Sequence, residues 1–163
     1  MNVGMSGHQD LGSPERVMWI KHQLRQQLER TVFSSGISSL AAGADQLFAK
    51  IVLDLGHQIE VVIPCEGYES AFENSNAEQT FQELKRKAVR CYVLDFSRPS
   101  EEAFFAAGKR VVEISDLLFA VWDGQPAAGL GGTADIVKHA LKHGKQVFHI
   151  NPDAMTTRLL GHR

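Results

Sequence analysis

The fold is decided by the stretch DGQPAAGLGGTAD, residues 123–135. It follows an apolar run at residues 117–122 that is short enough for a buried strand, and it precedes residues 136–143, which have helical spacing. A glycine-rich loop that opens a helix brings unpaired N–H groups and a partial positive charge to a backbone that a ligand can approach closely. The stretch therefore predicts a phosphate-binding turn. The alternative is a flexible loop in which Thr133 is an ordinary N-cap.

Strands and helices alternate on both sides of this stretch. The predicted helices cover residues 14–28, 46–55, 76–89, 101–113 and 132–142. The predicted strands fall at residues 3–7, 34–39, 58–63, 91–94, within 114–122, and 146–150. A β-α unit repeated six times with short connections predicts an α/β fold, in which a parallel sheet has helices on both faces. We expect a single domain over residues 1–152, followed by a loosely held tail at 153–163.

Composition narrows the class of protein. The chain has 163 residues, of which 44% are hydrophobic and 22% charged, and these values suit one globular domain with one core. The net charge of −2 indicates neither a nucleic-acid nor a membrane surface, and no apolar run is long enough to span a bilayer. The N-terminus lacks the pattern of a signal peptide. Cys65 and Cys91 form no disulfide framework, so we expect a cytoplasmic protein, and we predict no metal and no cofactor.

Polar and small residues gather in the turns that follow the predicted strands. In an open α/β sheet, ligands bind outside the carboxyl ends of the strands, where these turns meet. Two of the turns combine small residues with the start of a helix, which suits a phosphate or a ribose phosphate. The predicted ligand-binding residues are Ser6, Gly7, His8, Gly43, Asp45, Glu66, Gly131, Gly132 and Thr133.

Each of these positions also has an ordinary structural explanation. Asp45 and Asp135 fit the first turn of a helix, where the helix dipole favours an acid. His8 fits an unremarkable loop, and Glu66 and Tyr68 fit a solvated one. The prediction of a site therefore depends on these turns converging in space.

Five segments, taken in order over residues 3–152, resemble the SLOG superfamily on its YspA/YpsA-like side. They are GMSGH at residues 4–8, SLAAGADQ at 39–46, VIPCEGYE at 62–69, GGTAD at 131–135 and QVFHINP at 146–152. The resemblance implies a Rossmann-like three-layer α/β/α fold with a mostly parallel sheet of about six strands. It also implies that the protein binds a nucleotide or a nucleotide-derived ligand.

The resemblance also implies roles for single residues. The superfamily includes the LONELY GUY phosphoribohydrolases, the DNA-processing protein A group and sensor domains. By resemblance, Gly131, Gly132 and Thr133 would hold phosphate, and the turn at residues 43–45 would form the facing wall. Asp135 stands where the phosphoribohydrolases carry glutamate in P-G-G-x-G-T-x-E. This chain lacks the proline, has one glycine fewer and carries the shorter acid, which bears on hydrolysis more than on binding.

Three functions follow as hypotheses. The first is a sensor or ligand-binding module that takes a nucleotide or nucleotide-derived small molecule and forms a homo-oligomer, without a membrane or nucleic-acid partner. The alternative is an enzyme that cleaves the N-glycosidic bond of a nucleoside monophosphate, in which the catalytic residue Asp135 or Asp45 would stabilise the oxocarbenium-like ribose or activate water. A DNA-binding module is the third, which the balanced charge disfavours.

Overall fold

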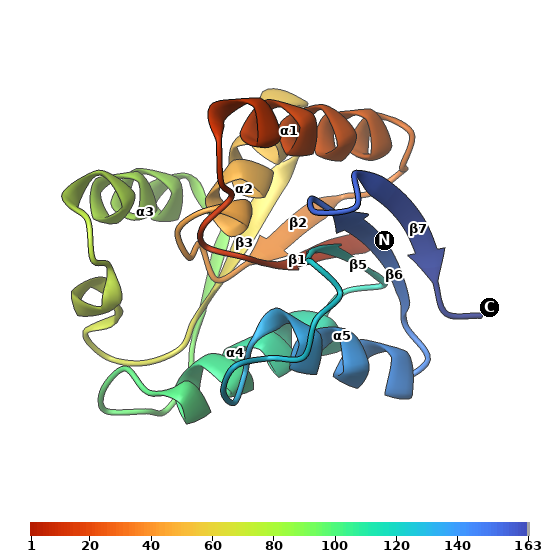
Figure 1. Cartoon of the computed structure of the whole chain (residues 1–163). Helices are drawn as coiled ribbons and strands as arrows, with labels where there is room; N and C mark the ends of the chain where they lie inside the picture. The colour runs from red at the N-terminus through yellow and green to blue at the C-terminus, as the bar shows by residue number, and fades with distance from the viewer. Residues whose placement is uncertain (163) are drawn as a thin grey trace.

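A seven-stranded sheet forms the centre of the computed structural model, which describes residues 1–162 (Figure 1). Its order is β4-β3-β2-β1-β5-β6-β7, and every neighbouring pair is parallel except β6 and β7. The strands are β1 (Asn2–Gly7), β2 (Ser35–Ser38), β3 (Gln58–Ile63), β4 (Arg90–Val93), β5 (Leu117–Val121), β6 (Gln146–Asn151) and β7 (Thr156–Leu160).

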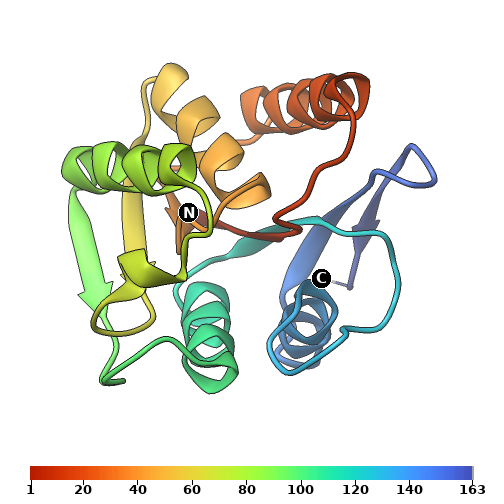
Figure 2. The same ribbon diagram turned by 60° about the vertical axis from the view of Figure 1, so that its left-hand side comes forward.

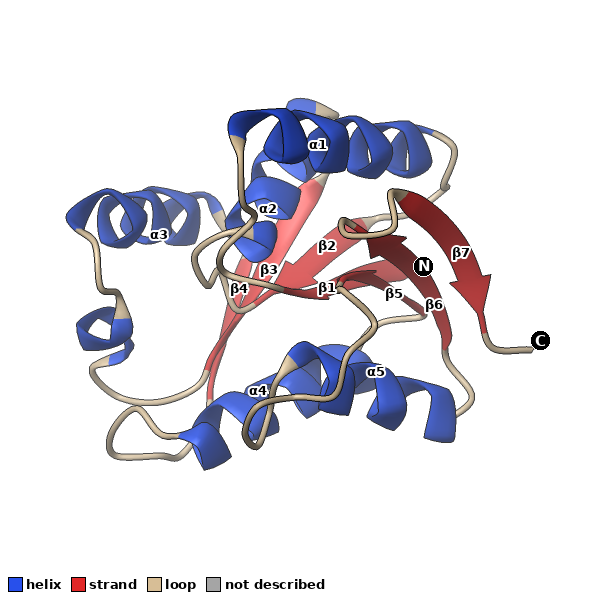
Figure 3. Ribbon diagram, in the orientation of Figure 1, coloured by secondary structure: helices blue, strands red, loops and turns tan. Residues whose placement is uncertain are grey.

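Helices cover both faces of this sheet, as Figure 3 shows. One face carries α1, α2 and α3, and the other carries α4 and α5. The helices are α1 (Pro14–Glu29), α2 (Ala44–Asp54), α3 (Ser75–Lys87), α4 (Glu101–Glu113) and α5 (Thr133–Lys142), with a short 3-10 helix, η1 (Tyr68–Ala71). The predicted Rossmann-like three-layer α/β/α fold is confirmed. No helix formed by residues 1–162 is both long enough and apolar enough to cross a membrane.

Helix α1 illustrates how the sequence specifies these elements. The Ser13 hydroxyl accepts a hydrogen bond from the Arg16 N–H (3.2 Å) and Pro14 occupies the first helical position. Ile20, Leu24 and Leu28 recur at four-residue spacing and are buried in the core, on the inner face of α1. Burial of such a side chain contributes about 1.5–3 kcal/mol each.

The direction of strand addition reverses at β1. From β1 the chain adds β2, β3 and β4 on one side and then returns to add β5 on the other side. The carboxyl ends of β1 and β5 therefore flank the point at which a ligand is expected in a sheet of this kind.

The chain after residue 152 differs from the prediction of a loosely held tail. Strand β7 pairs antiparallel with β6, from Asn151 opposite Thr156 to Val147 opposite Leu160. The Asn151 side chain closes the connecting turn, because its Oδ1 accepts hydrogen bonds from the Asp153 and Ala154 N–H groups at 3.0 Å each. Strand β6 ends at Asn151, and Asn151-Pro152 begins the hairpin turn that leads into β7.

Candidate ligand-binding site

A cleft of about 740 Å³ opens at the carboxyl edge of the sheet, where the strand order reverses. Its walls come from the ends of β1 and β2, from η1 and α3, from α4, and from the loop between β5 and α5. The predicted residues that line it are Ser6, Gly7, His8, Asp45, Gly131, Gly132 and Thr133. Turns far apart in the sequence therefore meet at one cavity.

Gly43 and Glu66, which were also predicted to bind the ligand, do not line the cleft. Gly43 has φ +85°, and a side chain there would overlap the backbone carbonyls of His8 and Gln9. The neighbouring Ala44 N–H donates to the His8 carbonyl at 3.1 Å. Gly43 thus allows the turn after β1 to pack closely against the start of α2. Glu66 is exposed at the surface.

The start of α5 has free hydrogen-bond donors beside the cleft. Thr133 is only 8% exposed, lines the cleft, and has no hydrogen-bond partner for its hydroxyl within residues 1–162. The N–H groups of Gly132, Thr133 and Ala134 likewise have no partner among the described residues. An anion placed here would meet amides, a hydroxyl and the positive end of the helix dipole.

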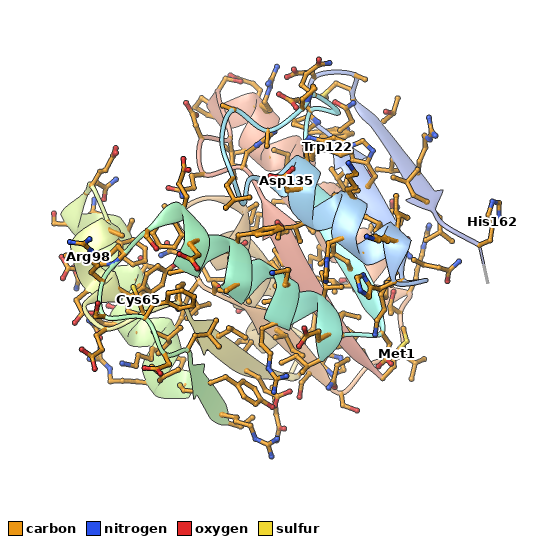
Figure 4. The ribbon with its side chains drawn as sticks, turned by 90° about the horizontal axis from the view of Figure 1, so that it is seen from below. Met1, Cys65, Arg98, Trp122, Asp135 and His162 are labelled. Carbon is orange, nitrogen blue, oxygen red and sulfur yellow. The ribbon has the colours of Figure 1, made fainter. Side chains whose placement is uncertain are left out.

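Asp135 holds the loop that presents these donors. Its Oδ2 accepts a hydrogen bond from the Gly131 N–H at 3.0 Å, and Asp135 does not line the cleft. Gly131 has φ +86°, a conformation that favours glycine. Figure 4 shows Asp135 at the start of α5, beside the loop that it braces. The structure thus gives Asp135 a positioning contact, and its predicted catalytic role stays a prediction.

Asp45 is the acid that reaches the cleft. It lies in the first turn of α2, is 6% exposed, and accepts a hydrogen bond from the Ala41 N–H at 3.4 Å. Burial raises the pKa of Asp45 from 3.8 to about 7, and hydrogen bonds from Ser38 and from the Ala41 and Ser39 backbone partly oppose this rise. Near neutral pH, this carboxyl group can therefore accept or donate a hydrogen bond.

His8 ties the ends of β1 and β5 together at the cleft. Its Nε2 accepts a hydrogen bond from the Asp123 N–H at 3.0 Å, so the ring proton of the neutral imidazole lies on Nδ1. The Asp123 Oδ1 atom lies 3.5 Å from the same Nε2 atom. That nitrogen already accepts the hydrogen bond from the Asp123 backbone N–H. The Nδ1–H of His8 is therefore a further donor at this edge of the sheet.

The ionisable side chains that line the cleft are mostly acidic. Its ionisable side chains apart from Tyr68 are those of His8, Asp10, Asp45, Glu73 and Glu101, and no lysine or arginine is among the described residues that line it. An anion at the start of α5 would therefore be held by neutral donors and a helix dipole rather than by salt bridges.

The far wall of the cleft is aromatic, which the sequence analysis did not predict. Tyr68 and Phe72 come from η1 and its end, and Phe104 comes from α4. Tyr68 is 5% exposed and lies edge-on to Phe72 and Phe81, with ring centroids 5.3 and 5.2 Å apart. The interpretation of Tyr68 as a solvated loop residue is wrong, because the short helix η1 turns it inward. The four-residue spacing of Tyr68 and Phe72 was the available signal.

Comparison with known proteins gives likenesses in structure alone. No family model matches the chain, and no curated protein matches its sequence. DNA processing protein A from Helicobacter pylori, whose structure is described for its single-stranded DNA binding mode, has a TM-score of 0.65, 18% identity and 91% coverage of this chain. DNA processing protein A from Streptococcus pneumoniae has a TM-score of 0.65, 17% identity and 91% coverage. The molybdenum cofactor binding protein from Rippkaea orientalis has a TM-score of 0.56, 19% identity and 92% coverage.

These likenesses define the class of fold. The chain spans 64% and 49% of the length of the two DNA processing protein A structures and 76% of the Rippkaea orientalis protein. All three share its Rossmann-like arrangement. Their sequence identities are low, so the likeness shows a common fold and gives no information about the ligand.

Proposed function

We propose that the cleft binds a nucleotide or nucleotide-derived small molecule, and that the protein acts as a sensor or ligand-binding module. The observation that carries the proposal is the start of α5, where the Thr133 hydroxyl and the N–H groups of residues 132–134 border the cleft and lack partners within residues 1–162. The first N–H groups of a helix have no partner within the helix, so at the edge of a cleft they are available to a ligand. A phosphate oxygen is an acceptor that suits all of them.

The size and lining of the cleft support a small molecule. Its volume of about 740 Å³ falls within the range of roughly 300–1,000 Å³ that is typical of ligand sites. Donors lie at the α5 end and aromatic rings at the η1 end, which suits a ligand with an anionic group and a planar ring. The Rippkaea orientalis neighbour is named for a small ligand, the molybdenum cofactor, and that cofactor belongs in the test panel.

The lining favours a small ligand over a DNA strand. The Helicobacter pylori neighbour is described for its single-stranded DNA binding. Such binding follows the phosphate backbone with lysine and arginine side chains, whereas the described lining of this cleft has none. A gel-shift series across salt concentrations tests this, and tight, salt-sensitive binding of single-stranded DNA would contradict the proposal.

Asp45 favours a second candidate function, the hydrolysis of an N-glycosidic bond. A carboxyl group with a pKa of about 7 in a ligand cleft suits general acid–base catalysis. Asp135 is the weaker candidate, because its carboxylate binds the Gly131 N–H. Incubation with nucleoside monophosphates and chromatography for free base tests this function. Activity that survives Asp45→Asn unchanged would contradict a role for Asp45.

Calorimetric titration tests the main proposal directly. The panel holds the four common nucleoside monophosphates, cyclic nucleotides, ADP-ribose and the molybdenum cofactor. We expect at least one to bind, and Thr133→Val to weaken that binding about tenfold to a hundredfold, the value of a hydrogen bond to a charged group. Thr157→Val is the matched control, because Thr157 is exposed on β7 and does not line the cleft.

Two outcomes would contradict the proposal. One is that the wild type binds no member of the panel. The other is that Thr133→Val binds as tightly as the wild type and the Thr157→Val control.

A further inference from the structure

The hydroxyl of Tyr68 has no hydrogen-bond partner in the part of the chain that the structure describes, although the side chain is 5% exposed. The ring packs against Phe72 and Phe81, and a phenylalanine at this position would keep both contacts. Tyr68 lines the cleft, and its hydroxyl is not among the fully covered polar atoms. The hydroxyl is therefore reached from the cleft, and packing does not account for it.

Tyr68 is a neutral donor at any physiological pH. Burial, and after it the nearby Asp45 and Cys65 groups, raise the pKa of Tyr68 far above its ordinary value of 10. Asp45 and Tyr68 both line the cleft. The phenolic hydroxyl offers its proton to an acceptor, while the Asp45 carboxyl can take either role.

Tyr68 and Thr133 lie at opposite ends of the cleft. The turn after β3 leads to Tyr68 and the loop after β5 leads to Thr133, and the sheet order β3-β2-β1-β5 separates the two strands by three spacings. At about 4.8 Å a spacing this is roughly 14 Å. Figure 2 shows η1 and α5 on opposite sides, with α4 between them.

The surroundings of Tyr68 suit a flat ring. Phe72 and Phe104 also line the cleft, and the rings of Tyr68 and Phe104 have centroids 6.1 Å apart. Aromatic walls favour a planar group and give no directional choice between rings, whereas a single buried donor does. A ligand that reached from Thr133 to this wall would present a ring edge to the Tyr68 hydroxyl.

We propose that Tyr68 determines which ring the cleft accepts, by donating a hydrogen bond to an acceptor on the ring edge of a nucleoside phosphate whose phosphate lies at the start of α5. This inference rests on the proposed function and adds the residue that makes binding selective for the base.

The test compares Tyr68→Phe with the wild type by calorimetric titration of AMP, GMP, CMP, UMP and ribose 5-phosphate. We expect Tyr68→Phe to weaken the preferred nucleotide about two- to tenfold, the value of one neutral hydrogen bond, and to narrow the spread among the four nucleotides by the same factor. Binding of ribose 5-phosphate, which has no base, is expected to stay unchanged. That readout separates a specificity role from a merely structural one, because a distorted cleft would weaken both kinds of ligand.

Tyr92→Phe is the matched control. The Tyr92 hydroxyl bonds to Glu60 on β3 and does not line the cleft, so this variant is expected to bind all five compounds as the wild type does. Equal selectivity of Tyr68→Phe and wild type, with Thr133→Val weakened, would overturn the inference and leave the proposed function standing. Absence of binding by the wild type would overturn both.

Discussion

Helices α2 and α5 begin in similar sequences and differ in what their first turns can do. Each opens after glycine and has an acid in its first turn: Gly43-Ala44-Asp45 in α2 and Gly132-Thr133-Ala134-Asp135 in α5. At α2 the turn after β1 covers the helix start, and the Ala44 N–H already donates to His8. At α5 the Asp135 carboxylate accepts a hydrogen bond from the Gly131 N–H in the preceding loop. The N–H groups of residues 132–134 remain without partners among the described residues.

The comparison shows that a glycine-rich helix start is not a ligand site by itself. What covers the first turn decides the outcome, and the covering segment comes from a distant part of the chain. The α2 start contributes a buried acid to the cleft, and the α5 start contributes free donors. The predictions below test this division, from the largest expected effect to the smallest.

The first prediction concerns the buried acid of α2. Because the pKa of Asp45 is about 7 in the folded protein, against the ordinary aspartate value of 3.8, the folded state binds the proton more tightly than the unfolded state. The stabilisation from this proton is complete below pH 4 and is lost as the pH rises to 7, by up to about 4 kcal/mol. Urea unfolding of wild type and Asp45→Asn between pH 4 and 8 measures it. A free-energy difference between the two proteins that does not change with pH would contradict the assignment.

The second prediction concerns the crossing of the two turns at α2. Gly43→Ala should cost about 3 kcal/mol of unfolding free energy, because a Cβ would meet the backbone of His8 and Gln9 as well as adopt φ +85°. Gly144→Ala is the control, since its φ of +73° is similar and nothing lies within 4 Å. The control should cost about 1–2 kcal/mol. Equal losses in denaturant unfolding would show that the turns do not press on each other there.

The third prediction concerns the brace at α5. Asp135→Ala removes the acceptor of the Gly131 N–H and should lower the unfolding free energy by about 1 kcal/mol, as the loss of a cap does. Ligand affinity should fall with it, because the loop that presents Thr133 is released. Glu113→Ala, which removes an exposed ion pair with Arg110, is expected to change the stability by less than about 0.5 kcal/mol. A fully stable Asp135→Ala with unchanged affinity would contradict the positioning contact.

Most of the fold could be predicted from the sequence, because local signals and the buried faces agree. The cap at Ser13 and the spacing of Ile20, Leu24 and Leu28 specify α1 without reference to the rest of the chain. Strand β7 could not be predicted in this way, since its residues are mostly exposed and it is held by pairing with β6 and by the Asn151 turn.

The site was predicted in part for a similar reason. Residues 131–133 carry their own signal, a glycine-rich loop before a helix, and they line the cleft. Gly43 carries the same signal, but the backbone that covers it comes from the turn after β1. Tyr68 lies on η1 and Phe104 on α4, and their rings become neighbours only in the folded protein, so no local pattern could pair them.

Amide NMR of the nitrogen-15-labelled protein, titrated with AMP and with inorganic phosphate, tests the central claim most directly. The account predicts that the largest shifts occur at the N–H groups of Gly132, Thr133 and Ala134, while that of Ala44, already bonded to His8, stays in place. Largest shifts at Ala44 and Asp45, or no shifts at residues 132–134, would contradict it.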